Sequence, residues 1–313
     1  MHTSTKIGFI GLGLMGDGMA RNLVKAGVDL LVFDTNCEAV ERLVASGAKA
    51  ASNIIELTRQ SQVVFTSLPG PVQVEEVVLG RDGILENTSA GKVLFDLSTN
   101  SLSLVRRIHE AFKQKGAHML DAPISGGPAG AASGELAIWV GGEKDVFEQN
   151  SNLLHIVGKS PRYVGAIGAG TVTKLVHNLT GYMIQLTLAE TFSLGVKAGV
   201  DPLDLWEAMH LGLVGKGSPL KMLTKQFLPG KFDQPSFRLK GGHKDVGLAT
   251  AMARELGVPM RLANMTLEEM TEGMARGWGE HDARAFLQLQ LERAGVRIAV
   301  DPGRLEAAIK AVS

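Results

Sequence analysis

The sequence is poor in cysteine and has no excess of charge of either sign. Cys37 is the single cysteine among 313 residues, so no internal disulfide can form, and a reducing cytoplasm is the expected location. Lysine plus arginine equals aspartate plus glutamate, at 32 each. This balance argues against a nucleic-acid-binding surface and against attraction to an anionic membrane.

Long apolar runs and metal-binding motifs are also missing. No uninterrupted apolar stretch approaches the roughly 20 residues that cross a bilayer. Residues 1–5 lead into a strand-like segment without the charged and apolar regions of a signal peptide. We therefore expect neither membrane insertion nor export. The 8 histidines include no HExxH pair, so zinc-dependent alcohol oxidation is disfavoured and no metal is expected.

A glycine-rich turn lies between the first predicted strand and the first predicted helix. Segment 6–10 reads as a buried strand, residues 11–16 carry the pattern GxGxxG, and the apolar spacing that follows predicts a helix ending at Gly27. In this context the first glycine permits a tight turn, the second lets a pyrophosphate approach, and the third allows close packing. We therefore expect a dinucleotide to be bound by Gly11, Gly13, Leu14, Met15 and Gly16.

An acidic residue ends the second predicted strand, 30–33. The carboxylate of Asp34 can accept hydrogen bonds from both hydroxyls of an adenosine ribose, and it would repel a 2′-phosphate. We therefore expect NAD as the cofactor, with NADP less favoured. The alternative is that no ligand binds here, and that the three glycines only form a turn while Asp34 lies at the surface. The order of strand, turn and helix disfavours this alternative.

Strand and helix patterns alternate through the first half of the chain. Further strands are predicted at 63–68, 92–95, 117–120, 136–140 and 155–157, and helices at 40–45, 72–78 and 102–115. The alternation predicts a Rossmann fold, a doubly wound and mainly parallel sheet with ligands at the carboxyl ends of its strands. Leu68, Pro69 and Thr99 lie at such ends, so we expect them to contact nicotinamide or its ribose, although ordinary turn residues would look the same.

Small residues dominate segment 121–134, which follows one of these strands. Such a segment predicts a loop whose accessible backbone N–H groups could hold a carboxylate or a phosphate. A flexible turn without a ligand is the alternative.

From Gly168 onward the patterns are helical. The first run, 169–198, begins beside glycines and puts Lys174 and Asn178 on one face, near backbone N–H groups that lack helical partners. The two side chains could hold one polar ligand, although a solvated face is the common reading. We divide the chain into an NAD-binding domain, 1–167, and an all-helical domain for substrate binding and oligomerisation, 168–313. Later helices are predicted at 203–211, 218–227, 243–256, 261–275, 282–294 and 305–312.

Together these motifs resemble those of the β-hydroxyacid dehydrogenases, the family of 3-hydroxyisobutyrate dehydrogenase and tartronate semialdehyde reductase. The resemblance rests on segment 11–23, on Asp-Ala-Pro-Ile-Ser-Gly-Gly at 121–127, on Gly168-Ala-Gly170 with the lysine and asparagine after it, and on Lys244-Asp245. It implies a Rossmann domain, a long interdomain helix and an all-helical domain, assembled as a homodimer or homotetramer.

The resemblance also implies roles for individual residues. Lys174 would be the catalytic lysine, Asn178 would orient the substrate, and Lys244 would lie at the cleft for cofactor and substrate. The substrate, a small carboxylate with a hydroxyl on its β-carbon, would be held through its carboxylate by Ser125, Gly126 and Gly127. A lysine whose pKa is lowered by desolvation can accept the hydroxyl proton as hydride leaves the carbinol carbon.

A few positions depart from the family's usual pattern. His177 stands where relatives usually carry asparagine, and either a polar contact or a surface histidine would explain it. Gly241-Gly242 replaces bulkier residues, which could enlarge the substrate pocket or loosen a turn. Arg238 and Lys240 could read a second acidic group, or they could simply be solvated.

Other functions remain compatible with these motifs. The same site could reduce small aldehyde acids such as glyoxylate or succinic semialdehyde, but NADPH-using members of that kind typically carry Asn-Arg-Thr where this chain has Asp34-Thr-Asn36. Imine reductases resemble the family in fold and usually replace the residue at Lys174. A nucleotide sensor without turnover is the alternative from another class. A full 6-phosphogluconate dehydrogenase is disfavoured because its helical domain is much larger.

Overall fold

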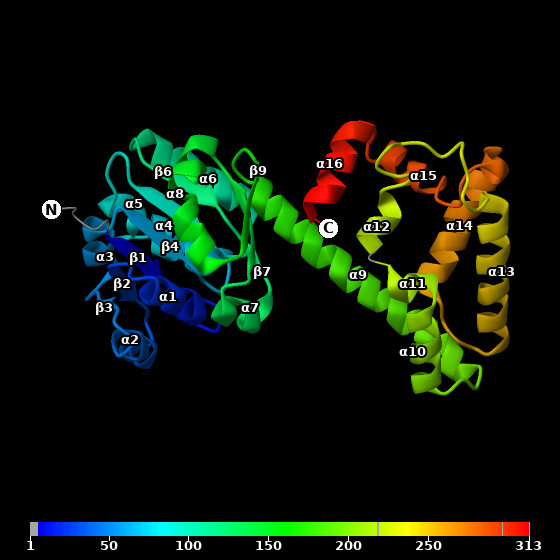
Figure 1. Ribbon diagram of the computed structural model, residues 1–313, viewed down its shortest axis with the longest axis horizontal. Coiled ribbons are helices and arrows are strands. Elements are labelled where there is room, and N and C mark those ends of the chain that lie inside the picture. Colours follow the sequence, from blue (N-terminus) through cyan, green and yellow to red (C-terminus); the bar gives the residue numbers. More distant parts are fainter. Residues whose placement is uncertain (1–5, 218, 296, 313) are drawn as a thin grey trace. The chain divides into compact units, whose positions relative to one another are not determined.

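The computed structural model describes residues 6–217, 219–295 and 297–312. The chain divides into two compact units, residues 1–180 and 181–313 (Figure 1). The boundary expected after residue 167 stays a prediction. Within helices, nothing is described of the side chains at 185, 186, 189, 202, 220, 244, 245, 248, 251, 252, 255 and 312.

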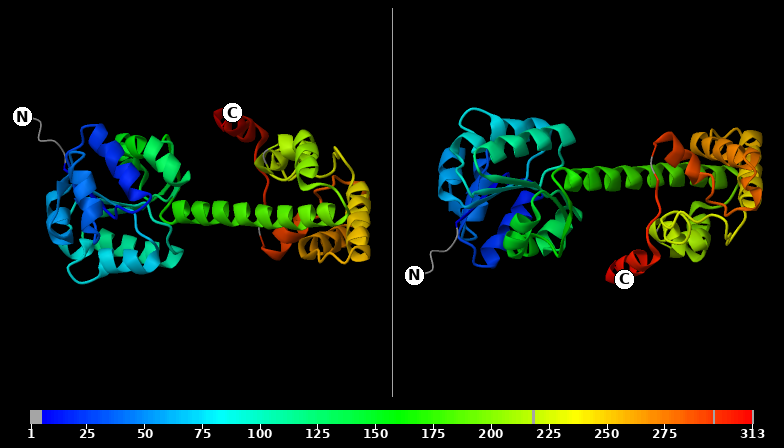
Figure 2. Two further views of the ribbon diagram at one scale, coloured as in Figure 1. Left: turned by 90° about the horizontal axis from the view of Figure 1, so that it is seen from below. Right: turned by 90° about the horizontal axis from the view of Figure 1, so that it is seen from above.

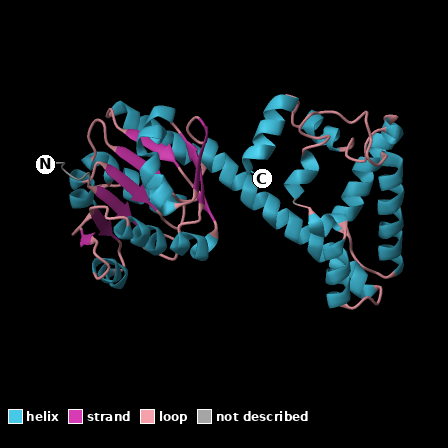
Figure 3. Ribbon diagram, viewed as in Figure 1, coloured by secondary structure: helices cyan, strands magenta, loops and turns pink. Residues whose placement is uncertain are grey.

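The first unit is built around one sheet, as the alternation of patterns predicted. Its strand order is β3-β2-β1-β4-β5-β6-β8-β7, with β9 paired to β8. The strands from β1 to β6 are parallel, while β8 runs antiparallel to β6 and β7. The strands, magenta in Figure 3, are β1 (Ile7–Ile10), β2 (Leu30–Phe33), β3 (Lys49–Ala50), β4 (Val63–Thr66), β5 (Val93–Asp96), β6 (His118–Asp121), β7 (Ile124–Ser125), β8 (Ala137–Gly141) and β9 (Ser160–Gly165).

Helices cover both faces of this sheet (Figure 2). Alternate side chains of the central strands enter two separate cores, so that Phe65 packs on one face while Val64 packs on the other. Phe65 lies between Phe9 and Phe95, with ring centroids 6.0 and 5.5 Å away. Burial of each such side chain contributes about 1.5–3 kcal/mol. The helices are α1 (Gly16–Lys25), α2 (Cys37–Val44), α3 (Ile54–Gln60), α4 (Pro71–Leu79), α5 (Ile84–Asn87), α6 (Leu102–Gln114), α7 (Gly127–Ser133) and α8 (Lys144–Val157).

Two local predictions in this unit were wrong. The strand expected at 155–157 is the last turn of α8, because Leu154 and Val157 are buried at helical spacing; the strand, β9, follows it. The loop expected across 121–134 contains β7 and α7. A proline in the first turn and three alanines favour that helix, and Gly134 with φ +73° ends it.

The second unit consists of helices joined by turns and irregular segments, and its described residues form no strand, only an isolated bridge between Arg238 and Asp282. Asp282 is fully buried and accepts hydrogen bonds from the amides of Ser236 and Arg284, each at 3.0 Å. Helix α9 (Ala169–Lys197) begins in the first unit. The later helices are α10 (Pro202–Leu211), α11 (Leu213–Lys216), α12 (Pro219–Leu223), α13 (Leu239–Glu255), α14 (Arg261–Ala275), η1 (Trp278–Glu280), α15 (Leu287–Arg293) and α16 (Pro302–Val312).

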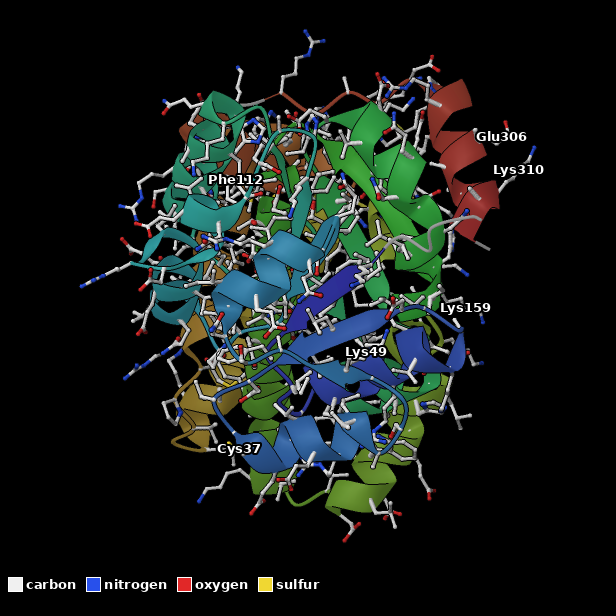
Figure 4. The ribbon with its side chains drawn as sticks, turned by 90° about the vertical axis from the view of Figure 1, so that its left-hand side faces the viewer. Cys37, Lys49, Phe112, Lys159, Glu306 and Lys310 are labelled. Atoms are coloured by element: carbon white, nitrogen blue, oxygen red, sulfur yellow. The ribbon has the colours of Figure 1, made fainter. Side chains whose placement is uncertain are left out.

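The surface carries ordinary polar features. Glu306 and Lys310 form an ion pair along α16 at 2.7 Å, and Cys37 is exposed at the start of α2 (Figure 4). Among the described residues, no helix is long and apolar enough to cross a membrane. The described residues also contain no group of three or more histidine, cysteine, aspartate or glutamate side chains that could hold a metal ion.

Candidate active site

The turn between β1 and α1 leaves open space above its middle glycine. Gly11 has φ +94°, and a Cβ there would lie 2.3 Å from the Ser67 carbonyl oxygen. A Cβ at Gly16 would lie 1.8 Å from the carbonyl oxygen of Gly11, so neither position can carry a side chain. A Cβ at Gly13 would meet no atom within 4 Å. This is the open approach that a pyrophosphate needs.

Helix α1 begins at this turn without a capping side chain. Met15, at the N-cap position, makes no side-chain hydrogen bond to the helix start. The amides of a first helical turn have no partner within the helix, and the helix dipole there favours negative charge. The start of α1 therefore suits the phosphates of a nucleotide.

Asp34 connects the end of β2 to the glycine turn. Its Oδ2 accepts a hydrogen bond from the Leu12 amide at 2.6 Å, and its Oδ1 accepts one from the Asn36 amide at 2.7 Å. An ionised carboxylate offers about four lone-pair positions, so capacity remains for two ribose hydroxyls. Asp34 thus holds the turn and can still bind a sugar.

These residues surround a cavity of about 690 Å³. Among the residues predicted to bind the cofactor whose side chains are described, all but Thr99 line it. Thr99 is exposed on the loop after β5. Lys244 belongs to α13, but its side chain lies outside the described part.

The cavity also has a wall that sequence reasoning missed. Gln73, Glu76 and Val77 of α4 line it, together with Arg81 after that helix. The only available signal was the position of α4 directly after the strand end at Leu68 and Pro69. A second cavity, of about 490 Å³, is lined by Leu12, Gly13, Leu14, Asp17, Asp34, Asn36, Ala39 and Arg42.

A buried carboxylate joins the loops after β4 and β5. Asp96 accepts hydrogen bonds from Thr66 Oγ1 and Asn100 Nδ2, each at 3.0 Å. It also accepts the Ser98 amide at 3.1 Å, and Ser98 Oγ in turn accepts the Leu68 amide at 2.9 Å. Burial raises the pKa of Asp96, against these hydrogen bonds. The network fixes Leu68 at the cavity.

The start of α9 differs from the sequence expectation. We expected backbone N–H groups without partners beside Gly168 and Gly170. Instead the amides of Gly168 and Thr171 donate to the buried Asp121 carboxylate, at 2.8 and 2.6 Å. The close packing that the two glycines allow brings the end of β6 against the helix. This helix start is therefore closed by the protein itself.

Lys174 follows one turn later and is half-buried. Desolvation lowers its pKa from the ordinary value of 10.5, which is the condition for a lysine to act as a base. His177 lies against Trp139 of β8, with ring centroids 5.0 Å apart. Its Nδ1 is 3.2 Å from Oδ1 of Asn178. A proton on His177 Nδ1 would be donated to Asn178 Oδ1. This bond would fix the Asn178 side chain and leave its NH₂ group free to donate to a ligand.

The segment predicted to bind the substrate carboxylate is held by strand pairing. Ser125 is opposite Ala137 in the β7–β8 pair. Gly126 and Gly127 follow with φ +140° and +65°, values that favour glycine. Both are exposed, Gly126 as the N-cap residue of α7 and Gly127 as its first residue, so their amides are open to a ligand.

Two departures in the second unit have local explanations. Arg238 and Lys240 both form ion pairs with Glu280. A Cβ at Gly241 would lie 2.8 Å from Cζ of Phe237, so the glycine makes room for this ring. Because Arg238 and Lys240 pair with Glu280 at the surface of their own unit, their charges fit the solvated interpretation better than the binding of an acidic substrate group.

Known proteins resemble this chain along almost its whole length. The family model for the NAD binding domain of 6-phosphogluconate dehydrogenase matches residues 6–168. The model described as NAD-binding of NADP-dependent 3-hydroxyisobutyrate dehydrogenase matches residues 168–290. The 2-(hydroxymethyl)glutarate dehydrogenase of Eubacterium barkeri is 36% identical over 95% of this chain and 99% of its own. The 3-hydroxyisobutyrate dehydrogenase of Pseudomonas aeruginosa is 34% identical over 91% and 97%.

A solved structure adds to this. The 3-hydroxyisobutyrate dehydrogenase of Mycobacterium tuberculosis with L-serine has a TM-score of 0.64 and 27% identity, over 92% of this chain and 99% of that one. The sheet, its glycine turn and these matches define an oxidoreductase that acts on CH–OH groups with a nicotinamide dinucleotide. The chain belongs to the β-hydroxyacid dehydrogenase family. The predicted family and fold are confirmed, whereas the roles assigned to single residues stay predictions.

Proposed function

We propose that this protein oxidises a small β-hydroxyacid with NAD, using Lys174 as the general base. The observation that carries the proposal is the half-buried lysine on α9, whose pKa desolvation lowers. It belongs to the same compact unit as the glycine turn and Asp34. The named relatives act on 2-(hydroxymethyl)glutarate and 3-hydroxyisobutyrate. Both compounds carry a primary hydroxyl on the carbon β to a carboxylate, and so does the L-serine named with the mycobacterial structure.

The residues at the glycine turn fit a dinucleotide. The open space above Gly13 would admit the pyrophosphate, and the Asp34 carboxylate would accept the ribose hydroxyls. Asp34 favours NAD over NADP because it would repel a 2′-phosphate. Asp17 and Arg42 also line the smaller cavity, and Asp17 forms ion pairs with Arg42 and with Arg21.

In the proposed reaction, the amides at Ser125, Gly126 and Gly127 bind the substrate carboxylate. Asn178 donates to the substrate and orients it. Neutral Lys174 takes the hydroxyl proton on Nζ, and bound nicotinamide supplies the hydride acceptor. In the reverse direction, the Lys174 ammonium polarises an aldehyde and returns the proton, which would serve a small aldehyde acid.

We also propose a homodimer or homotetramer. Large apolar side chains are exposed on α9 and on the helices that follow, in numbers unusual for a free surface. A second copy of the chain could cover them, and light scattering would give the mass. A single species of one chain's mass would count against it. The exposed residues include Val172, Leu175, Val176, Leu179, Tyr182, Met183, Leu188, Val196, Leu203, Trp206, Leu211, Leu213 and Val214. The cytoplasmic location stays a prediction.

The function is tested by measuring NADH formation with a panel of acids. It contains 3-hydroxyisobutyrate, L-serine, 2-(hydroxymethyl)glutarate and glycerate, and lactate serves as a control because its hydroxyl is on the α-carbon. We expect turnover with at least one β-hydroxyacid, faster with NAD than with NADP, and none with lactate. Tight NADH binding without turnover of any acid, in either direction, would favour a nucleotide sensor.

A further inference from the structure

A buried side chain of the sheet holds the first turn of α9. Asp121 is the last residue of β6 and is 1% exposed. Its two carboxylate oxygens accept the amides of Gly168 and Thr171. Without them these amides, just before α9 and in its first turn, would have no partner in the helix. Asp121 therefore acts as an N-terminal cap that comes from a different element.

The packing here excludes the usual cap from the helix itself. Gly168 has φ +90°, and a Cβ there would lie 2.4 Å from Cδ1 of Leu102, so the position cannot carry the side chain of a serine or an aspartate. A Cβ at Gly141 would lie 2.5 Å from Oδ1 of Asp121. One at Gly170 would lie 2.7 Å from the Asp121 backbone oxygen. The three glycines create the space in which strand end and helix start meet.

The charge of this cap distinguishes it from a neutral one. Burial raises the pKa of Asp121, while the hydrogen bonds from Thr171 and Gly168 oppose that rise. The N-terminal end of a helix dipole also favours a negative charge. Hydrogen bonds to a charged acceptor are roughly twice as strong as neutral ones, so the ionised form holds the helix more rigidly than an amide or a hydroxyl would.

We propose that Asp121 is a positioning residue for hydride transfer. By accepting the amides of Gly168, just before α9, and of Thr171, in its first turn, it fixes the rotation of the helix and so the direction of Lys174. Lys174 lies one turn beyond Thr171, and a slip by one residue would rotate it by about 100°. The end of β6 also leads within a few residues into Ser125. One side chain thereby links the lysine to the predicted carboxylate-binding segment. The inference rests on the proposed function.

The test is Asp121→Asn, which keeps the size of the side chain, loses its charge and turns an NH₂ group toward one of the amides. We expect kcat to fall about 100-fold, the effect of misplacing a catalytic group by roughly 1 Å. NADH affinity should not change, because Asp121 does not line the dinucleotide cavity. The primary deuterium isotope effect on kcat should rise as hydride transfer becomes slower than product release. Asp121→Ser, which can accept one amide, replaces this variant if it does not fold.

The matched control is Asp96→Asn. Asp96 pairs with Asp121 in register on the adjacent strand and is also 1% exposed. It bonds Thr66, Ser98 and Asn100 and not α9. We expect Asp96→Asn to be less stable and to bind the cofactor more weakly, because the loop at Leu68 is no longer fixed. Its isotope effect on kcat should equal that of the wild type.

The outcomes separate the two proposals. If Asp121→Asn loses stability but keeps the kcat and the isotope effect of the wild type, the carboxylate is only structural and the inference is overturned. If Lys174→Ala keeps the turnover of the wild type, the proposed function itself fails. If Lys174→Ala loses turnover while Asp121→Asn keeps the turnover of the wild type, the inference is overturned and the proposed function stands.

Discussion

Helices α1 and α9 both begin beside glycines in the first unit, but the protein fills only the second of these helix starts with its own carboxylate. At α1, the N-cap residue Met15 makes no side-chain bond, and the space above Gly13 is open. At α9, Asp121 accepts two amides, and no room remains around Gly170. Glycine therefore has a different role at each helix start. At α1 it leaves room for a ligand, and at α9 it lets two backbone segments pack closely.

This difference divides the work of an oxidoreductase. An open helix start can bind an anion, and it can release it again after turnover. A closed helix start cannot bind a ligand, but it gives the next turn a fixed direction. Lys174 occupies that turn. We infer that affinity for the cofactor comes from α1 and the alignment of the proton acceptor from α9.

The largest expected effect is that of Lys174→Ala. We expect kcat to fall about 1,000-fold, within the range that general acid and base catalysis contributes. The dissociation constant of NADH should change little, because the side chain does not line the dinucleotide cavity. Stopped-flow turnover and fluorescence titration measure the two quantities. If kcat and NADH affinity fell together, the assignment of cofactor affinity to α1 and of proton-acceptor alignment to α9 would be contradicted.

A pair of glycine variants tests the two helix starts directly. Gly13→Ala meets no atom within 4 Å, so its free energy of unfolding should change by less than about 0.5 kcal/mol. NADH affinity should nevertheless fall steeply, because the methyl group occupies the approach of the pyrophosphate. Gly170→Ala would place Cβ 2.3 Å from the Trp139 carbonyl oxygen, and stability should drop by about 1–3 kcal/mol. Urea denaturation with NADH titration checks both, and equal stability losses would contradict the comparison.

The preference for NAD is expected to weaken in Asp34→Ser. Removing the carboxylate removes its repulsion of a 2′-phosphate and one acceptor for the ribose hydroxyls. The ratio of kcat/KM for NAD to that for NADP should fall about tenfold, which corresponds to about 1.4 kcal/mol. Because Asp34 also holds the Leu12 amide, far-ultraviolet dichroism must remain unchanged. A ratio equal to that of the wild type would contradict the assigned role.

The smallest effect concerns pH. Desolvation lowers the pKa of Lys174, and oxidation needs the neutral amine, so kcat for oxidation should rise with pH and level off. Its midpoint should lie below 10.5, the ordinary pKa of lysine. Reduction, which needs the ammonium, should show the opposite trend over the same range. A midpoint at or above 10.5 for oxidation would mean that the base is another group or that the lysine is solvated.

The sequence predicted the open helix start far better than the closed one. The turn of α1 is local: strand, GxGxxG and helix are adjacent, and Asp34 ends the next strand. The lysine could be found as well, because its spacing from Asn178 lies within one helix. Asp121 appeared only as part of a motif. Its bonds to α9 span 47 and 50 residues of sequence, and no periodicity reveals such a contact.

The remaining misses have the same physical origin. Helix α7 was expected to be a loop, since glycine and alanine have opposite helix propensities and the pattern alone does not decide between them. The α4 wall of the dinucleotide cavity comes from side chains that only the fold brings to Asp34 and Leu68. The polar partners of Asp96 are likewise divided between the end of β4 and the loop after β5.

The most direct test of the difference between the two helix starts is amide hydrogen exchange of the wild-type protein with and without NADH. We expect the amides at 13–16 to exchange rapidly in the free protein and to slow when NADH binds. The amides of Gly168 and Thr171 should already be slow without NADH, because Asp121 accepts them. Rapid exchange of these two amides in the free protein, with protection appearing only when NADH binds, would contradict the account.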